Sequence, residues 1–437
     1  MLSRILFTLI TLFSFGFLAH TLYHISKLFL LTKKEFRFDQ LLRRSKILLF
    51  VAFGQTKMMK RPLAGVLHAL VYWGFLVITI GTLEMMIDGI TGTERVLSFL
   101  GIIYDIITSS ADILAALIII SCLVFLGRRY ITKPKRFIAP EMKPTSRMDA
   151  TFILGMILFL MVTLLCMNAA YFTSHPHSAK GHFPVSQSLV FLFAGFDHST
   201  LHAIEKFNWW AHILIIYGFM NVLPFSKHFH VFSSMPNVFF TRLEPYSRLT
   251  NMESVTREVK LILDPSATVE TPAAAPERFG VKDAEDVTWK TLLDSYTCTE
   301  CGRCTAVCPA NITGKALSPR KLFIDLRRRM KDKGPGLIKN GKEFSDGKSL
   351  IGEGYITEAE LWACTTCMAC VEECPVDIDH VPFIIDMRRN LAMEESKVPA
   401  GLAMMFTNIE NNGAPWQYST SDRLNWAGDI FINEKAN

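Results

Sequence analysis

The sequence predicts a mainly α-helical protein, with a five-helix transmembrane bundle over residues 1–235 followed by a cytoplasmic α-helical domain. Long apolar segments are confined to the first half of the chain, and basic residues fill alternate loops between them. The second half is ordinarily polar and holds eight of the 10 cysteines. Half of all residues (50%) are apolar, and this division into a membrane part and a soluble part explains that composition.

Five apolar segments are long enough, or nearly so, to cross a hydrocarbon core of about 30 Å. They lie near residues 4–31, 63–87, 110–127, 150–172 and 208–226. The third is the shortest, and we expect the stretch before it, with Asp105 and Asp112, to run along the outer interface. The first is too long for a signal peptide and lacks a small-residue cleavage site, so we expect it to span the membrane.

Basic residues are concentrated in two loops, 32–62 and 127–149. The opposite loops offer Arg95 in one case, and Lys180 and Lys206 in the other. The positive-inside rule then places the N-terminus outside the inner membrane of a bacterium or archaeon, and everything after residue 226 in the cytoplasm. The net charge of +6 lies largely in these loops. It therefore indicates topology and lipid headgroup contact, and no nucleic acid partner is expected.

Cysteine spacing is the most specific chemical signal in the chain. Two runs read C-x2-C-x2-C-x3-C-P: Cys298, Cys301, Cys304 and Cys308 before Pro309, and Cys364, Cys367, Cys370 and Cys374 before Pro375. This is the ligand run of paired [4Fe–4S] clusters. One such run could be a zinc site or a chance pattern, but two complete runs with both prolines favour clusters, and hence electron transfer.

The fourth cysteine of each run is expected to cross over. In two-cluster ferredoxins, the last cysteine of a run ligates the other cluster. The prediction is therefore that cluster 1 is held by Cys298, Cys301, Cys304 and Cys374, and cluster 2 by Cys364, Cys367, Cys370 and Cys308. The two remaining cysteines, Cys122 and Cys166, lie in apolar segments and are expected to be small apolar packing residues.

The soluble half divides into three parts. Residues 236–288 are interpreted as an amphipathic exit segment and a linker, because 264–288 is rich in Pro, Ala, Thr and Glu. Residues 289–400 form the cluster domain, in which 55 residues separate Cys308 from Cys364. That insert is too long for a compact βαββαβ ferredoxin, and helical patterns with Thr357 as an N-cap predict a helical module. Residues 401–437 are expected to be a docking tail.

Histidines at membrane depth are functional candidates. His68 lies near the cytoplasmic end of the second apolar segment, and His212 and His230 lie 18 residues apart at the fifth. If that helix continues, they share one face with a rise of about 27 Å, which suits one haem in each leaflet. His68 and His230 would then ligate an inner b haem, with His24 as an alternative ligand. The alternative interpretation is that these histidines pack helices together.

The outer site is less complete. At the depth of His212, the second segment offers Ile78, Thr79 and Thr82 but no histidine. The outer loop offers five histidines as partners: His175, His177, His182, His198 and His202. His212 could instead line a quinone pocket. Carboxylates near this face could relay protons or could be interfacial side chains; they are Glu84, Asp88, Asp105 and Asp112.

The membrane half resembles a known family of cytochromes. Residues 208–237, NWWAHILIIYGFMNVLPFSKHFHVFSSMPN, resemble the last helix of the nitrate reductase gamma-type membrane cytochrome b family. The resemblance implies that His212 and His230 ligate an outer and an inner haem. Residues 61–84, RPLAGVLHALVYWGFLVITIGTLE, resemble its second helix, which implies an inner ligand at His68. The family's next histidine falls on Ile78, so one or two b haems are expected.

The soluble half resembles the helical ferredoxin module of heterodisulfide-reductase-like and glycerol-3-phosphate-dehydrogenase iron–sulfur subunits. The fusion is similar to membrane-bound heterodisulfide reductase and to the b-haem type of electron-transfer-flavoprotein:quinone oxidoreductase. Residues 408–430, NIENNGAPWQYSTSDRLNWAGDI, resemble the junction that leads into a cysteine-rich CCG domain. This implies a separate catalytic CCG subunit, an electron-transfer flavoprotein or both as partners, menaquinone as the quinone, and no catalytic residue in this chain.

The resulting hypothesis is an oxidoreductase subunit that passes electrons between a cytoplasmic redox partner and membrane quinone. One alternative keeps the clusters but treats the membrane half as a haem-free anchor. Another is a membrane redox sensor, which is disfavoured because no kinase, cyclase or DNA-binding pattern accompanies the clusters.

Overall fold

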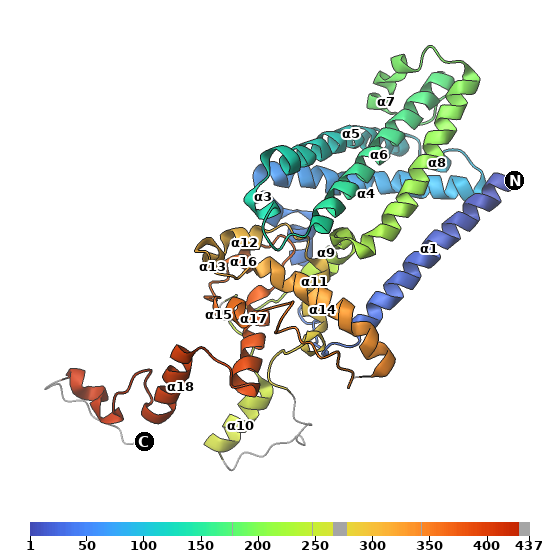
Figure 1. Ribbon diagram of the computed structural model, residues 1–437. Helices are drawn as coiled ribbons and strands as arrows, with labels where there is room; N and C mark the ends of the chain where they lie inside the picture. Colours follow the sequence, from blue (N-terminus) through green and yellow to red (C-terminus); the bar gives the residue numbers. More distant parts are fainter. Residues whose placement is uncertain (177, 247, 265–277, 342, 428–437) are drawn as a thin grey trace.

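The computed structural model describes residues 1–176, 178–246, 248–264, 278–341 and 343–427. Within these ranges the chain is helical and has no β-strand; its isolated β-bridges join Lys33 to Thr288 and Ile351 to Ile356. Figure 1 shows long helices on one side and a compact group of short helices beneath them. The predicted mainly α-helical class is therefore confirmed.

Five long helices build the apolar half: α1 (Leu2–Phe29), α4 (Pro62–Thr91), α5 (Ile102–Gly127), α6 (Pro144–Ser174) and α8 (His198–Val222). Among the described residues, α1, α4, α6 and the helical stretch Ile102–Thr132 are each long and apolar enough to cross a membrane. The pair His198–Phe225 and Lys227–Phe239 is bent by 101° and adds a fifth candidate only if it is one broken span. A bundle of five spans stays a prediction.

The bend changes one expectation, because the helix that carries His212 does not continue to His230. Pro224 offers no N–H to continue the hydrogen-bond ladder, and Ser226 is extended, with φ −93° and ψ 157°. His230 begins a separate helix, α9 (His230–Phe239). The two histidines therefore do not share the face of one straight helix.

The third long helix also differs from expectation. α5 begins at Ile102, so Asp105 and Asp112 lie on the helix itself rather than on a stretch that precedes it. Asp112 is buried, and its carboxylate accepts hydrogen bonds from Val185 N (2.7 Å), Ser186 N (2.9 Å) and the Ser186 hydroxyl (2.5 Å). These donors at α7 (Pro184–Ser188) offset the cost of burying the carboxylate.

The inner loop between α1 and α4 is also ordered. It contains α2 (Leu41–Ile47), the π-helix Leu48–Phe53 and α3 (Thr56–Met59). Gly65 lets α4 approach this loop closely, because a Cβ there would lie 2.6 Å from the carbonyl oxygen of Met58. This approach places the first turns of α4, including His68, against residues 55–59.

The cluster domain is built from short helices around one long one. Its elements are α11 (Trp289–Thr297), α12 (Arg303–Val307), α13 (Pro309–Ile312), α14 (Pro319–Asn340), α15 (Glu358–Trp362), α16 (Ala369–Glu373) and α17 (His380–Arg389). The apolar face of α14 forms the centre of the core through Leu322, Phe323, Leu326 and Met330, all fully buried. Thr357 caps α15 in a capping box with Glu360, which confirms the predicted N-cap.

Packing of the domain begins before Trp289, within the stretch interpreted as linker. Val281, Ala284 and Val287 are buried in the same core. The linker residues 265–277 lie outside the described residues. α10 (Glu253–Leu263) precedes them, and α18 (Ala400–Asn412) occupies the expected docking tail, where Figure 1 draws it apart from the rest of the chain.

Arg329→Met is expected to destabilise the cluster domain by about 3 kcal/mol, because it leaves the buried Asp283 carboxylate with fewer partners. The fully buried Arg329 guanidinium bridges Asp283 (2.7 Å) and Asp346 (2.6 Å). The loss of stability is measured as a fall in the temperature at which the cluster absorbance disappears. Arg328→Met is the control, because its partly exposed pair with Asp325 should contribute less than about 1 kcal/mol. Equal falls in both variants would contradict the prediction.

The two halves are held together by charged side chains. Lys57 pairs with Asp377, Lys60 with Glu372, and Arg61 with Glu373 (2.8 Å). Burial alone would lower the pKa of Lys57, but the Asp377 carboxylate raises it above its usual value. These basic residues were expected to contact lipid headgroups, whereas they pair with carboxylates in and directly after the second cysteine run. The inner loop therefore docks the cluster domain directly on the apolar half.

Candidate functional site

The two cysteine runs repeat one backbone conformation. Each run places left-handed residues two and four positions after its first cysteine: Glu300 (φ 57°) and Gly302 (φ 69°), then Thr366 (φ 57°) and Met368 (φ 61°). Such values turn the chain sharply and are uncommon outside glycine. In both runs the turn leads into a short helix, α12 or α16, and these two helices contact each other. The repeat brings the end of each run next to the other run.

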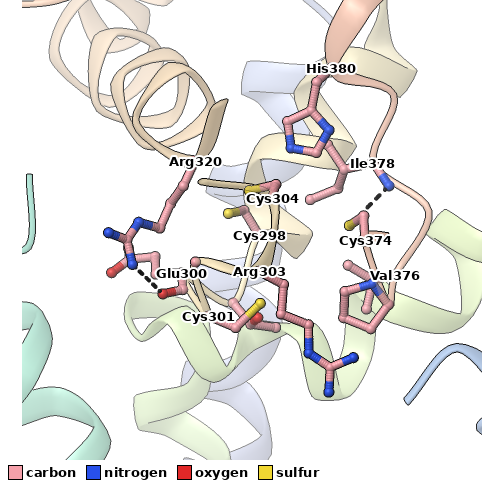
Figure 2. Close-up of a pocket in the computed structure, with 13 residues that line it drawn as sticks. Cys298, Glu300, Cys301, Arg303, Cys304, Arg320, Cys374, Val376, Ile378 and His380 are labelled. Carbon is pink, nitrogen blue, oxygen red and sulfur yellow. Dashed lines mark hydrogen bonds between the residues drawn. The ribbon is translucent and has the colours of Figure 1, made fainter. Parts of the chain in front are cut away.

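Four cysteines line one cavity in this arrangement (Figure 2). They are Cys298, Cys301 and Cys304 of the first run and Cys374 of the second. This is the crossed set that the spacing rule predicts for cluster 1. The other crossed set is also close together, since Cys308, Cys364 and Cys367 interact electrostatically with Cys370. Cys367 is the exposed member of that set.

Burial keeps the thiols of Cys298, Cys304 and Cys374 protonated unless a metal binds them. Burial raises the pKa of Cys298 to about 11, and it raises the pKa values of Cys304 and Cys374 well above the usual value. A bound metal deprotonates such thiols outright, and soft thiolates are the ligands of iron–sulfur clusters. Among the described residues, no three His, Cys, Asp or Glu side chains are close enough to hold a single metal ion.

Buried cationic and polar side chains complete the cavity of the Cys298 set. Arg303 and Arg320 line it and are 4% and 0% exposed. Arg320 Nη1 donates to the carbonyl oxygen of Glu300 (3.2 Å), and Gly302 permits this approach because a Cβ there would lie 2.5 Å from the same nitrogen. Two guanidinium groups beside four thiolates offset the negative charge of a cluster.

His380 was missed by sequence reasoning. It also lines the cavity, is 1% exposed, and packs edge-on against Phe323 at 5.1 Å. Its Nδ1 has no hydrogen-bond partner in the part of the chain that the structure describes. Burial lowers its pKa to about 4, so the ring is neutral at pH 7. The only signal in the sequence was a histidine six residues after Cys374.

His68 and His230 face each other across α4 and α9. Their ring centres are 6.4 Å apart, and their planes differ by 32°. Two imidazoles on opposite sides of one metal, with metal–nitrogen bonds of about 2.0 Å, would place their ring centres roughly 6.3 Å apart. The structure therefore brings together the two histidines that the sequence predicts as haem ligands, and the ligation itself stays a prediction. His228, which sequence reasoning passed over, lies 5.9 Å from His230, but its Nδ1 pairs with the Ser226 hydroxyl at 2.9 Å.

The outer histidine lies in a different environment. His212 is buried, and its Nδ1 lies 3.0 Å from both Leu160 O and Thr163 Oγ1. It lines a cavity of about 1720 Å³, including space open to solvent, together with Ile78, Glu84, Asp88 and Asp112. None of the outer-loop histidines among the described residues lines this cavity, and neither does Asp105. His177 lies outside the described residues.

The remaining histidine candidates lie elsewhere. His24 is exposed on α1 and contacts the rings of His20 (4.5 Å) and Tyr23 (5.8 Å). His182 pairs with the Ser109 hydroxyl at 2.8 Å, and His175 stacks near Tyr171 at 4.8 Å. The structure therefore brings His68 and His230 together and places His24 away from them.

The fold and this site define a class: a protein with a [4Fe–4S] dicluster domain and helices long and apolar enough to cross a membrane. The 4Fe-4S dicluster domain family matches residues 297–378, which include both cysteine runs. The chain therefore carries an iron–sulfur domain with an electron-transfer role, associated with a membrane through its apolar helices. No solved structure matches the chain.

Similarity to particular proteins extends over nearly the whole chain. The chain is 32% identical, over 91% of its length and 56% of the relative's, to the probable iron-sulfur-binding oxidoreductase FadF of Bacillus subtilis. It is 30% identical, over 98% of its length and 59% of the relative's, to the EtfAB:quinone oxidoreductase of Syntrophomonas wolfei. The chain thus spans less than three fifths of either relative. Their names support an oxidoreductase class for it.

A third relative is a component of an archaeal enzyme, the dihydromethanophenazine:CoB–CoM heterodisulfide reductase of Methanosarcina mazei. The chain is 29% identical to that component over 166 residues, which make up 35% of this chain and 38% of the relative. The resemblances to heterodisulfide reductase and to the flavoprotein:quinone oxidoreductase are thereby confirmed. The resemblance of the membrane half to nitrate reductase gamma-type cytochromes stays a prediction.

Proposed function

We propose that this chain is a membrane-anchored electron-transfer subunit that passes electrons between a cytoplasmic redox partner and the membrane quinone pool. The main support is that four cysteines from two distant runs line one cavity. The domain that contains this cavity docks on apolar helices, where His68 and His230 face each other. Cys298, Cys301, Cys304 and Cys374 would hold cluster 1, and Cys364, Cys367, Cys370 and Cys308 cluster 2. His68 and His230 would hold an inner b haem.

The position of Arg303 supports a short route between the two centres. Arg303 lines the cavity of the Cys298 set, and its Nη1 donates to the carbonyl oxygen of Lys57 at 3.3 Å. Lys57 lies in the inner loop two residues after Gln55, whose Oε1 is 3.2 Å from His68 Nδ1. Cys367 of the second set is exposed, whereas Cys298, Cys304 and Cys374 of the first set are buried. We infer that the second set faces the cytoplasmic partner.

The chemistry belongs to the cofactors, which store and release single electrons when bound. The chain supplies thiolate and imidazole ligands, buried cations and a dry surrounding. His212 and its cavity would serve an outer haem or the quinone, with menaquinone as the substrate. No catalytic residue is assigned to this chain, and we propose a CCG-domain protein, an electron-transfer flavoprotein or both as partners. The basic loops support an N-terminus outside and a cluster domain in the cytoplasm.

Metal and haem content of the purified full chain tests this function. Two clusters would supply about eight irons and about eight acid-labile sulfides per chain, with one or two haem irons in addition. Reduction of the haem by a menaquinol analogue would support the quinone. Eight cluster irons without haem would instead favour a plain membrane anchor, and four or fewer would contradict the two-cluster assignment.

A further inference from the structure

A buried glutamine of the inner loop lies against His68 of the histidine pair. Gln55 follows the π-helix Leu48–Phe53 and precedes α3, and it is 8% exposed. Glutamine is mostly found at protein surfaces. Its backbone is left-handed, with φ 54° and ψ 27°, a conformation that disfavours residues with a Cβ. Gln55 thus combines a left-handed backbone, a neighbouring π-helix and a buried side-chain amide. Strained backbone and π-helical turns are often found at functional positions.

The amide of Gln55 connects a backbone carbonyl to His68. Its Nε2 donates to Ala52 O at 2.5 Å, and its Oε1 lies 3.2 Å from His68 Nδ1. Because the amide nitrogen must face the Ala52 carbonyl, the amide oxygen faces the imidazole. An oxygen acceptor requires a donor opposite, so His68 Nδ1 carries the proton. The lone pair of the ring is then on Nε2, the nitrogen left to bind a metal.

We propose that Gln55 is a positioning residue for the inner haem site, which fixes the tautomer and orientation of His68 and sets the haem's reduction potential. The inference rests on the proposed function, since it requires a haem between His68 and His230. Partners of this kind, bonded to the second nitrogen of a ligating histidine, make it a stronger donor and hold its ring. A stronger imidazole donor favours the oxidised iron and lowers the potential.

The opposite histidine provides the contrast. His230 Nδ1 has the carbonyl oxygen of Lys227 as its neighbour, at 3.4 Å. That acceptor belongs to the backbone, so no side-chain substitution removes it. Gln55 is therefore the place where the chain can adjust one axial ligand while the other stays unchanged. The same glutamine also connects the docking loop, which contains Lys57, to the haem ligand.

Two substitutions and a matched control test the proposal in the full chain purified in detergent. Gln55→Met keeps the length but removes the acceptor, whereas Gln55→Glu keeps an oxygen opposite His68 Nδ1. Gln40→Met is the control: Gln40 is also left-handed (φ 48°) and precedes a helix, but it is exposed and its side chain contacts Asp39 and Arg43. Haem content, the haem midpoint potential and its low-temperature EPR spectrum are measured for each.

Gln55→Met is expected to raise the midpoint potential of the haem. A tenfold change in the equilibrium between oxidised and reduced haem corresponds to a shift of about 59 mV. Gln55→Glu should leave it unchanged or lower it, and Gln40→Met should match the wild type. Loss of haem from Gln55→Met alone would also support the proposal. Equal shifts in both Gln55 variants, haem loss in both, or no shift in Gln55→Met would overturn it. A wild-type chain without haem would instead contradict the haem assignment in the proposed function, a separate result.

Discussion

Replacing both Cys304 and Cys374 by alanine is expected to remove one cluster and leave about four irons per chain, although the two cysteines belong to different runs. The reason is that both line one cavity, so both substitutions fall on cluster 1. Replacing Cys304 and Cys308, which share a run, is expected to remove both clusters. Iron and sulfide analysis with EPR of the reduced protein distinguishes the two double variants.

The reverse pattern would contradict crossed ligation. If each run held its own cluster, the Cys304/Cys308 variant would keep one cluster and the Cys304/Cys374 variant would lose two. Cys122→Ser is the control, because Cys122 is buried between apolar helices, far along the chain from either run. Its iron content should equal that of the wild type.

His68→Ala is expected to remove the inner b haem, and with it that haem's share of the b-type spectrum, while both clusters remain. One axial ligand would be missing from a pair whose ring centres lie 6.4 Å apart, and the other ligand, His230, cannot replace it. Absorbance of the dithionite-reduced protein and haem extraction measure the loss. Cluster iron serves as the internal measure of folding, because its ligands come from residues 298–374.

His24→Ala is the matched control for this prediction. His24 lies on the neighbouring helix α1 and was an alternative ligand on sequence grounds, but its ring is exposed and contacts His20. Its haem content should be that of the wild type. A haem spectrum that survives His68→Ala but disappears in His24→Ala would show that the ligand pair is a different one.

Much of the cluster site was predictable because its information is local. The spacing within each run determines which thiols a short turn can present, and the crossing rule predicts Cys374 beside Cys298. Thr357 was predictable as a cap for the same reason, because a capping box involves residues three apart. His380 and Arg320 were not predictable, because nothing in their neighbouring sequence indicates that they border a cavity.

Predictions from neighbouring residues were less successful where contacts with distant segments decide the conformation. The helix that carries His212 bends near Ser226. The expectation that His212 and His230 lie on the same face of one helix was therefore wrong. Asp112 was expected at the outer interface because the third apolar segment is short, yet it is buried on α5 and accepts hydrogen bonds from Val185 and Ser186 of α7. The basic residues of the inner loop were expected to contact lipid, and Lys57 instead pairs with Asp377.

The sequence by itself determined the helical class, the apolar segments and the two cysteine runs, and it singled out His68 and His230 as candidate ligands. These depend on composition and on spacings of a few residues, which act within one helix or turn. Only the tertiary structure decided that Gln55 contacts His68, that Arg303 joins the cavity to Lys57, and that the inner loop pairs with the cluster domain. Those contacts join residues that are up to hundreds of positions apart, and their formation depends on how the helices pack.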